Sequence, residues 1–264
     1  MNKHFILKNS YILLVFLFLF LPIIVLVVFS FNTSKMNIMF EGFTFYWYRE
    51  LFSNTELLNA FYNTLIVTSI STIVSTVIGT ISAIGLKKYR FFGKSAVNGL
   101  LYIPIVIPEI VLGISLLSIY TLLQLQLGMF TLILAHISFC IPFVIISVRA
   151  SLENTDPHLE EAALDLGASP WEIFWNVTIP NASSGIATGA LLALTLSLDD
   201  VVVSFFTAGP GSITLPLKIY SMIKTGVSPD VNALFSLILL FVIIVLTIIT
   251  IVQINKMKKL QVRA

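Results

Sequence analysis

Long apolar runs separated by short polar stretches make up most of this chain, and the lengths of the runs predict its fold class. Each run is long enough to cross a hydrocarbon layer of about 30 Å, since a helix rises about 1.5 Å per residue. Six such runs cover approximately residues 11–31, 59–86, 97–123, 129–148, 181–206 and 231–254. The pattern predicts an all-α integral membrane protein with six transmembrane helices, arranged as one domain over residues 1–264.

Two of these runs carry signals of their own. The first run follows Lys3 and Lys8. It is too long for the core of a signal peptide and lacks a small-residue cleavage site, so we interpret it as an uncleaved span. The third run contains Pro104 and Pro108. Because proline lacks the N–H that a helix interior needs, we expect a kink there.

The stretch from Asp156 to Pro180 is the most polar part of the chain, and it predicts two short helices outside the apolar runs. Asp156 can cap a first helix that begins at Pro157, a position that tolerates a missing N–H, and Gly167 offers a stop. Ser169-Pro170-Trp171-Glu172 then has the sequence of a capping box, with proline at the first position of the second helix.

The composition and charge agree with a membrane protein. Apolar residues make up 57% of the chain and charged residues 11%, whereas soluble domains carry about 25% charged residues. The net charge of +2 is too small to suggest binding to nucleic acid, and the single cysteine, Cys140, leaves no disulfide to form.

The positions of the basic residues predict the orientation. With six spans, both termini lie on the same side of the membrane, and that side holds Lys3, Lys8, Lys87, Lys88, Arg90, Lys94, Arg149, Lys256, Lys258, Lys259 and Arg263. The opposite side holds Lys35, Arg49, Lys218 and Lys224. Because basic residues accumulate in cytoplasmic loops, we expect both termini and the loop over residues 156–180 to be cytoplasmic.

The polar loop carries a motif with a fixed spacing. Glu161-Ala162-Ala163, then Gly167, then Val177-Thr178-Ile179-Pro180 resembles the EAA loop of ABC importer permeases. The resemblance implies a type I (MetI-like) permease fold in a bacterial inner membrane, with a cytoplasmic coupling helix that docks on an ATPase subunit. It assigns ATPase coupling to Glu161, Ala162, Ala163, Gly167 and Pro180. The Glu-Ala-Ala triplet alone also fits an ordinary surface helix with a glycine stop.

Segments outside the loop resemble one branch of these permeases, the spermidine/putrescine permeases. They are residues 108–111, 136–143, 195–210 and 214–233. The resemblance implies polyamine uptake with three kinds of partner: a PotB-type permease subunit, a PotA-type ATPase dimer and a PotD-type polyamine-binding protein outside the cytoplasm. It assigns the substrate path to Trp47, Glu109, Ser197, Asp199 and Asp200.

The residues themselves favour a cationic cargo. Glu109, Asp199 and Asp200 fall inside predicted spans, where an ionised acid costs about 2.5–3.5 kcal/mol and usually faces a cavity or a partner. Polyamine nitrogens, with a pKa of about 10, are protonated at pH 7. Two simpler interpretations stay open: Glu109 could cap the helix that restarts after Pro108, and the aspartates could be hydrated near the end of their span.

Other candidate groups have simpler explanations. Trp47, between Tyr46 and Tyr48, could bind an ammonium group through a cation–π contact of about 0.5–2 kcal/mol, or these aromatics could form an interfacial belt. His136, alone in the fourth run, is expected to be a packed residue bonded to a neighbour.

We expect no catalytic or metal site in this chain. Gly93-Lys94-Ser95 resembles the end of a phosphate-binding loop, but the earlier glycine of that motif would fall on Lys88, and no strand precedes it. The expected cofactors, ATP and Mg²⁺, would therefore be bound by the partner ATPase. Two alternatives remain: a permease for another solute, such as thiamine or ferric iron, and an intramembrane aspartyl protease. Neighbouring aspartates on a helix point about 100° apart, which disfavours the protease.

Overall fold

The computed structural model describes residues 3–35, 38–153, 155–156, 158–223 and 226–261. The chain divides into two compact units, each described here by itself. The terminal unit comprises Met1–Leu58 and Ser221–Ala264, and the central unit comprises Asn59–Tyr220. Apart from one isolated β-bridge between Asn32 and Phe43, the regular structure of the described residues is helical, as predicted.

Five helical segments among the described residues are long and apolar enough to cross a membrane, and a bent pair of helices would make a sixth. The five lie in α1 (Lys3–Phe29), α3 (Thr55–Lys88), α6 (Met129–Glu153), the stretch Pro170–Leu198 and α12 (Pro229–Gln261). The bent pair is α4 (Lys94–Val106) and α5 (Glu109–Leu122), whose axes meet at 112°. The kink expected in the third run is therefore a full break, because Ile107 is extended and Pro108 precedes the first residue of α5.

In the terminal unit, α12 packs against both α1 and α2 (Tyr46–Ser53). Trp47 and Leu51 on α2 are buried. The amide of Asn54, which follows α2, donates to the carboxylate of Asp230 in the first turn of α12 at 2.6 Å. This polar contact holds the end of α2 at the beginning of α12.

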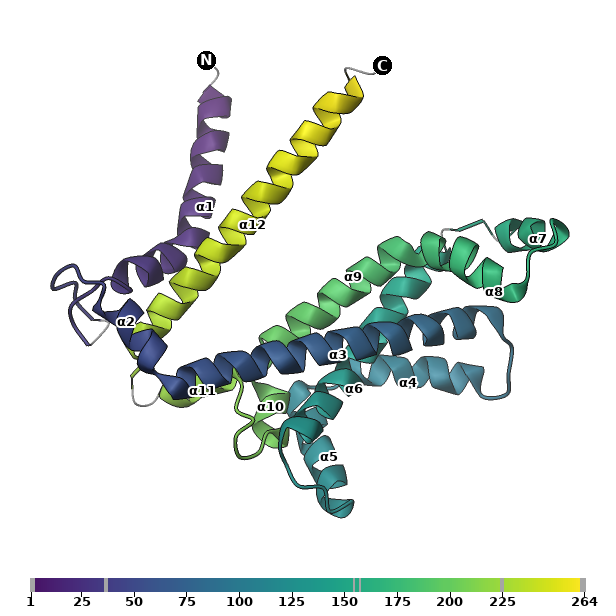
Figure 1. Ribbon diagram of the computed structural model, residues 1–264, viewed down its shortest axis with the longest axis horizontal. Helices are drawn as coiled ribbons and strands as arrows, with labels where there is room; N and C mark the ends of the chain where they lie inside the picture. The colour runs from purple at the N-terminus through teal and green to yellow at the C-terminus, as the bar shows by residue number, and fades with distance from the viewer. Residues whose placement is uncertain (1–2, 36–37, 154, 157, 224–225, 262–264) are drawn as a thin grey trace. The chain divides into compact units, whose positions relative to one another are not determined.

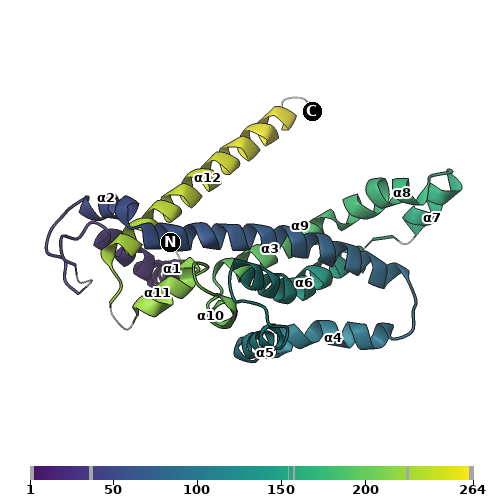
Figure 2. The same cartoon turned by 60° about the horizontal axis from the view of Figure 1, so that its bottom comes forward.

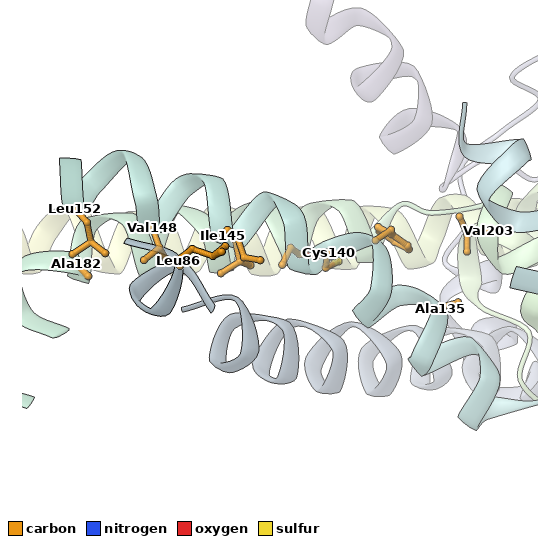
Figure 3. Packing of buried hydrophobic residues seen from close by; sticks show 12 residues of the cluster. Leu86, Ala135, Cys140, Ile145, Val148, Leu152, Ala182 and Val203 are labelled. Atoms are coloured by element: carbon orange, nitrogen blue, oxygen red, sulfur yellow. Dashed lines mark hydrogen bonds between the residues drawn. The ribbon is translucent and has the colours of Figure 1, made fainter. Parts of the chain in front are cut away.

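The core of the central unit lies where α6 packs along α9 (Ile179–Leu198). Figure 3 shows Ile145 and Val148 of α6 near Leu86 of α3, and Leu152 of α6 near Ala182 of α9. Gly185 lets the backbones approach closely, since a Cβ there would lie 2.6 Å from the carbonyl oxygen of Ser147. Small residues at helix crossings are typical of packing in membranes.

The predicted continuous fifth span, 181–206, is wrong. Helix α9 ends at Leu198, and a separate short helix, α10 (Val202–Thr207), follows it. The reason is local: the Asp200 carboxylate accepts hydrogen bonds from the N–H groups of Val203 and Ser204 at 3.1 and 2.7 Å and so caps a new helix. We call residues 199–201 the α9–α10 break.

Helices α5 and α10 pack against each other, and both views place them at the end of the central unit away from α7 and α8 (Figures 1 and 2). Gly113 of α5 meets Phe206 of α10 so closely that a Cβ on the glycine would lie 2.6 Å from the ring. Helix α11 (Leu215–Met222) follows α10 in the chain.

The polar loop forms α7 (His158–Asp165) and α8 (Pro170–Ile173), and a π-helical turn η1 (Phe174–Thr178) leads directly into α9. Pro157, the predicted first helical residue, lies outside the described residues, but the N–H of His158 donates to the Asp156 carboxylate at 2.9 Å, as a cap should. The stop at Gly167 (φ +85°) and the capping box of Ser169 with Glu172 are confirmed.

Candidate functional site

A buried polar network holds the α9–α10 break, and His136 of α6 lies at its centre. Its Nδ1 lies 2.7 Å from the hydroxyl of Ser197 in α9, and its Nε2 lies 3.1 Å from the hydroxyl of Ser204 in α10. The same Nε2 lies 3.5 Å from the Asp200 carboxylate. The Ser204 hydroxyl donates its one proton to Asp200 at 2.7 Å, so the ring Nε2–H is the donor to Ser204.

The two neighbouring aspartates have different environments. Asp200 is 9% exposed, and its carboxylate is engaged in capping α10 and in the network. Asp199 is exposed at the end of α9, where its N–H still donates to the carbonyl of Thr195 at 3.3 Å. The two carboxylates do diverge, but the cause is the break after Leu198 and not the geometry of adjacent residues on one helix. The exposed member of the pair, Asp199, is the one open to a cation.

The other predicted substrate-path residues fall in three places. Ser197 joins Asp200 in the network through His136. Glu109 is exposed at the first position of α5, the helix that packs on α10. Trp47 belongs to the terminal unit; it is buried, and its indole N–H donates to the carbonyl of Asn32 at 2.6 Å. The structure thus brings Ser197 and Asp200 together, whereas the substrate role of each residue stays a prediction.

Sequence reasoning missed the part that His136 and Ser204 play. The expectation that His136 is packed and bonded to a neighbour is confirmed, since the ring is fully buried. Its bridging role was not apparent, because its partners lie 61 and 68 residues further along the chain. For Ser204 the sequence does hold a local signal, because this residue follows Asp200 by four positions, within reach of a capping aspartate.

In the coupling loop, Glu160 and the motif residue Glu161 have different environments. One oxygen of Glu160 accepts a hydrogen bond from Thr178 of η1 at 2.7 Å, and the other lies 3.1 Å from Nζ of Lys88 at the end of α3. We call this contact the Glu160 tie. Glu161 is exposed and pairs with His158 at 3.0 Å. The tie therefore fixes α7 to the helices of the central unit and leaves Glu161 facing outward.

The outward surface of the loop carries several exposed apolar side chains. The large ones are Leu159, Leu164, Leu166, Trp171 and Trp175. Ala162 lies exposed among them and Ala163 half-buried, while Pro180 is exposed in the first turn of α9. Exposed apolar patches outside the spans are typical of protein–protein contacts, and small side chains let a partner's backbone approach closely.

The Glu160 tie depends on the ionised form of the Glu160 carboxyl, whose pKa is lowered. Burial raises the pKa of the Glu160 carboxyl, but the hydrogen bonds from Thr178 and Lys88 and the charges of Lys88 and Lys87 lower it by more, so the net pKa lies below its ordinary value. A carboxyl whose pKa is lowered by folding stabilises the fold above its unfolded-state pKa, and the stabilisation is lost as the pH falls through the folded-state value. The tie is therefore fully formed near neutral pH.

Reversing one charge of the tie is expected to loosen α7. Lys88→Glu places two carboxylates together, and hydrogen–deuterium exchange in His158–Asp165 should rise by about tenfold. A single exposed pair contributes less than about 1 kcal/mol, so most of this rise reflects the new repulsion. The double variant Lys88→Glu/Glu160→Lys should restore at least half of the protection. Lys94→Glu makes the same change at the first residue of α4, on the other side of the α3–α4 connection from Lys88. It is the matched control, and an equal rise there would contradict the prediction.

Several helices are long and apolar enough to cross a membrane, which defines the chain as a multi-pass membrane protein. The chain belongs to the family of binding-protein-dependent transport system inner membrane components, whose sequence profile matches residues 75–256. This confirms the predicted type of permease and its membrane location.

The more similar relatives are named as permease proteins of transport systems. The chain is 43% identical over 235 residues to the spermidine/putrescine transport system permease protein PotC of Escherichia coli (strain K12), which covers 89% of each chain. It is 38% identical over 235 residues to the putrescine transport system permease protein PotI of the same strain, covering 86% of this chain and 84% of that one. A bacterial ABC transporter that imports alginate has a similar fold, with a TM-score of 0.74 at 20% identity over 95% of this chain and 98% of that one.

Proposed function

We propose that this chain is the transmembrane permease subunit of an ABC importer that takes up the polyamines spermidine and putrescine. The observation that carries the proposal is the exposed carboxylate of Asp199 at the α9–α10 break, in a chain whose relatives are named as polyamine permeases. A second exposed acid, Glu109, begins α5, which packs on α10. Acidic groups along a path through the membrane attract a multiply protonated amine.

The energy would come from separate subunits. A PotA-type ATPase dimer would bind ATP and Mg²⁺ and dock on the exposed apolar surface of the coupling loop. A PotB-type permease would complete the pore, and a PotD-type protein would deliver the polyamine from outside the cytoplasm. In this arrangement both termini and the coupling loop face the cytoplasm. The separate environments of Glu160 and Glu161 support docking of the ATPase on this loop, because Glu161 and its partner His158 are both exposed, whereas Glu160 is tied to Lys88.

Two alternative functions can be compared with the arrangement of the aspartates and with the fold. An aspartyl protease needs two carboxyls that converge on one water, whereas here Asp200 caps α10 and Asp199 is exposed. A permease for thiamine or ferric iron would share the fold, so cargo competition has to separate it. Uptake that thiamine or ferric iron blocks and polyamines do not would refute the polyamine proposal.

The direct test is ATP-dependent uptake of labelled spermidine and putrescine by the assembled complex in vesicles. Wild type should transport both. Asp199→Asn should lower uptake by at least about tenfold, because an ion contact of 1.5–3 kcal/mol corresponds to roughly 10–100-fold.

The control is Glu41→Gln, which neutralises an exposed acid outside the predicted spans and should leave uptake unchanged. All variants are compared at equal ATPase-subunit occupancy. Transport of neither polyamine by wild type, or normal transport by Asp199→Asn, would count against the proposal.

A further inference from the structure

One side chain connects the two helices that flank the α9–α10 break. His136 lies on α6, the helix that packs along α9, and is fully buried. Its ring reaches Ser197 in the last turn of α9 with one nitrogen and Ser204 in the first turn of α10 with the other. The residues of the break therefore lie between two anchors on the same imidazole.

Asp199 lies in the chain between the two anchor residues, Ser197 and Ser204, and is not an anchor itself. It follows Leu198, the last residue of α9, and its side chain is exposed, while Ser197 before it and Asp200 after it are buried. An exposed side chain on a non-helical backbone keeps one direction only if the backbone on both sides is fixed. Here His136 contributes a contact on each side of the break. These contacts add to the cap that Asp200 makes on α10 and to the hydrogen bond from Ser197 to Thr68 at 3.4 Å.

Removing the imidazole would take one partner away from each of three buried polar groups. Ser204 would lose the Nε2–H, Ser197 would lose Nδ1, and the Asp200 carboxylate would lose the ring at 3.5 Å. Buried polar groups that lose partners rearrange to find new ones or water. The break is the non-helical segment between the two anchors, and a rearrangement there would carry Asp199 with it.

We propose that His136 is a positioning residue for cargo passage: acting through Ser197 and Ser204, it fixes the α9–α10 break so that the Asp199 carboxylate faces the transported cation. The imidazole touches no cargo in this role. The cargo part of the inference rests on the proposed function, whereas the anchoring part does not.

The anchoring is tested by the mobility of a spin label at position 199 in the assembled complex. The label is attached through Asp199→Cys in a Cys140→Ala background, since Cys140 is the one native cysteine. His136→Leu should add a mobile component to the spectrum. His136→Gln offers one donor and one acceptor at similar reach, and should restore most of the immobile spectrum.

Thr131→Val is the matched control. Thr131 is on α6, is as fully buried as His136, and also bonds α10, but its hydroxyl donates to the carbonyl of Thr207 at the far end of that helix. Its loss should leave the label immobile. If His136→Leu fails to assemble, Ser204→Ala carries the same expectation of a mobile component, since it removes the anchor on α10 together with the hydroxyl bond to Asp200.

Uptake of labelled spermidine then tests the link to Asp199. Asp199→Asn should lower uptake at least tenfold in wild type and in Thr131→Val, but less than threefold in His136→Leu, because the carboxylate there is already misplaced. A full tenfold loss in His136→Leu, or an unchanged spin-label spectrum in that variant, would overturn the positioning role. A mobile spectrum without polyamine uptake by wild type would keep the anchor and refute the proposed cargo.

Discussion

Replacing Gly185 by valine is expected to abolish accumulation of the folded protein. Gly185 lies where α9 crosses α6, and a Cβ at this position would lie 2.5 Å from Cβ of Ser151, 2.6 Å from the Ser147 carbonyl oxygen and 2.9 Å from Cα of Val148. Two of these atoms belong to the backbone, which cannot rotate away as a side chain can. The helices would have to separate along the main packing interface of the central unit.

The loss should be large because overpacking alone costs about 1–3 kcal/mol, and separation adds the loss of contacts between Ala182, Val148 and their neighbours. The free energy of unfolding of a folded protein is only about 5–15 kcal/mol. We expect at least a fivefold fall in the amount of protein that elutes as a single folded peak in detergent, and a lower melting temperature for what remains.

Gly99→Ala is the matched control for Gly185→Val. Gly99 is also in a helix, α4, but a Cβ there meets nothing within 4 Å. Alanine favours a helix over glycine by about 1 kcal/mol, so this variant should accumulate at least as well as wild type. Normal accumulation and melting of Gly185→Val would contradict the assigned helix crossing.

The helices were predictable from sequence because their signals are local. Apolar length identified the spans, and the capping box at Ser169 and the glycine stop at Gly167 fixed the elements of the loop. Apolar continuity from 181 to 206 predicts one span and so misses the α9–α10 break. The break arises at Asp200, whose carboxylate accepts hydrogen bonds from Val203 and Ser204 and caps a new helix.

The arrangement of the candidate site depends on contacts that no local pattern contains. Glu160 and Glu161 are adjacent, and the sequence alone gives no reason to separate them. Lys88, 72 residues before Glu160 in the chain, forms an ion pair with Glu160, whereas the Glu161 side chain faces outward. The same holds for Trp47, whose partner is a carbonyl oxygen at Asn32. Residue type could therefore nominate candidates, but tertiary contacts decide which of them stay accessible.

Gly167→Val is expected to uncouple transport while the permease itself stays folded. Gly167 has φ +85°, a left-handed conformation that costs an ordinary L-residue about 1–2 kcal/mol and a β-branched residue more. A Cβ there would clash with nothing within 4 Å, so the effect comes from the backbone alone. The turn between α7 and α8 should change shape, and with it the surface that carries Trp171 and Leu166.

Three quantities are measured: copurification of the ATPase subunit, ATP-driven uptake and the melting temperature of the permease. We expect uptake to fall at least about tenfold while the melting temperature changes little. Gly167→Asn is the discriminating control, because asparagine tolerates the left-handed conformation better than other non-glycine residues. It adds a larger polar side chain at the same place, yet should retain most coupling. Equal loss in both variants would mean that the side chain at 167 blocks the docking surface, and normal transport by Gly167→Val would refute a coupling role for this turn.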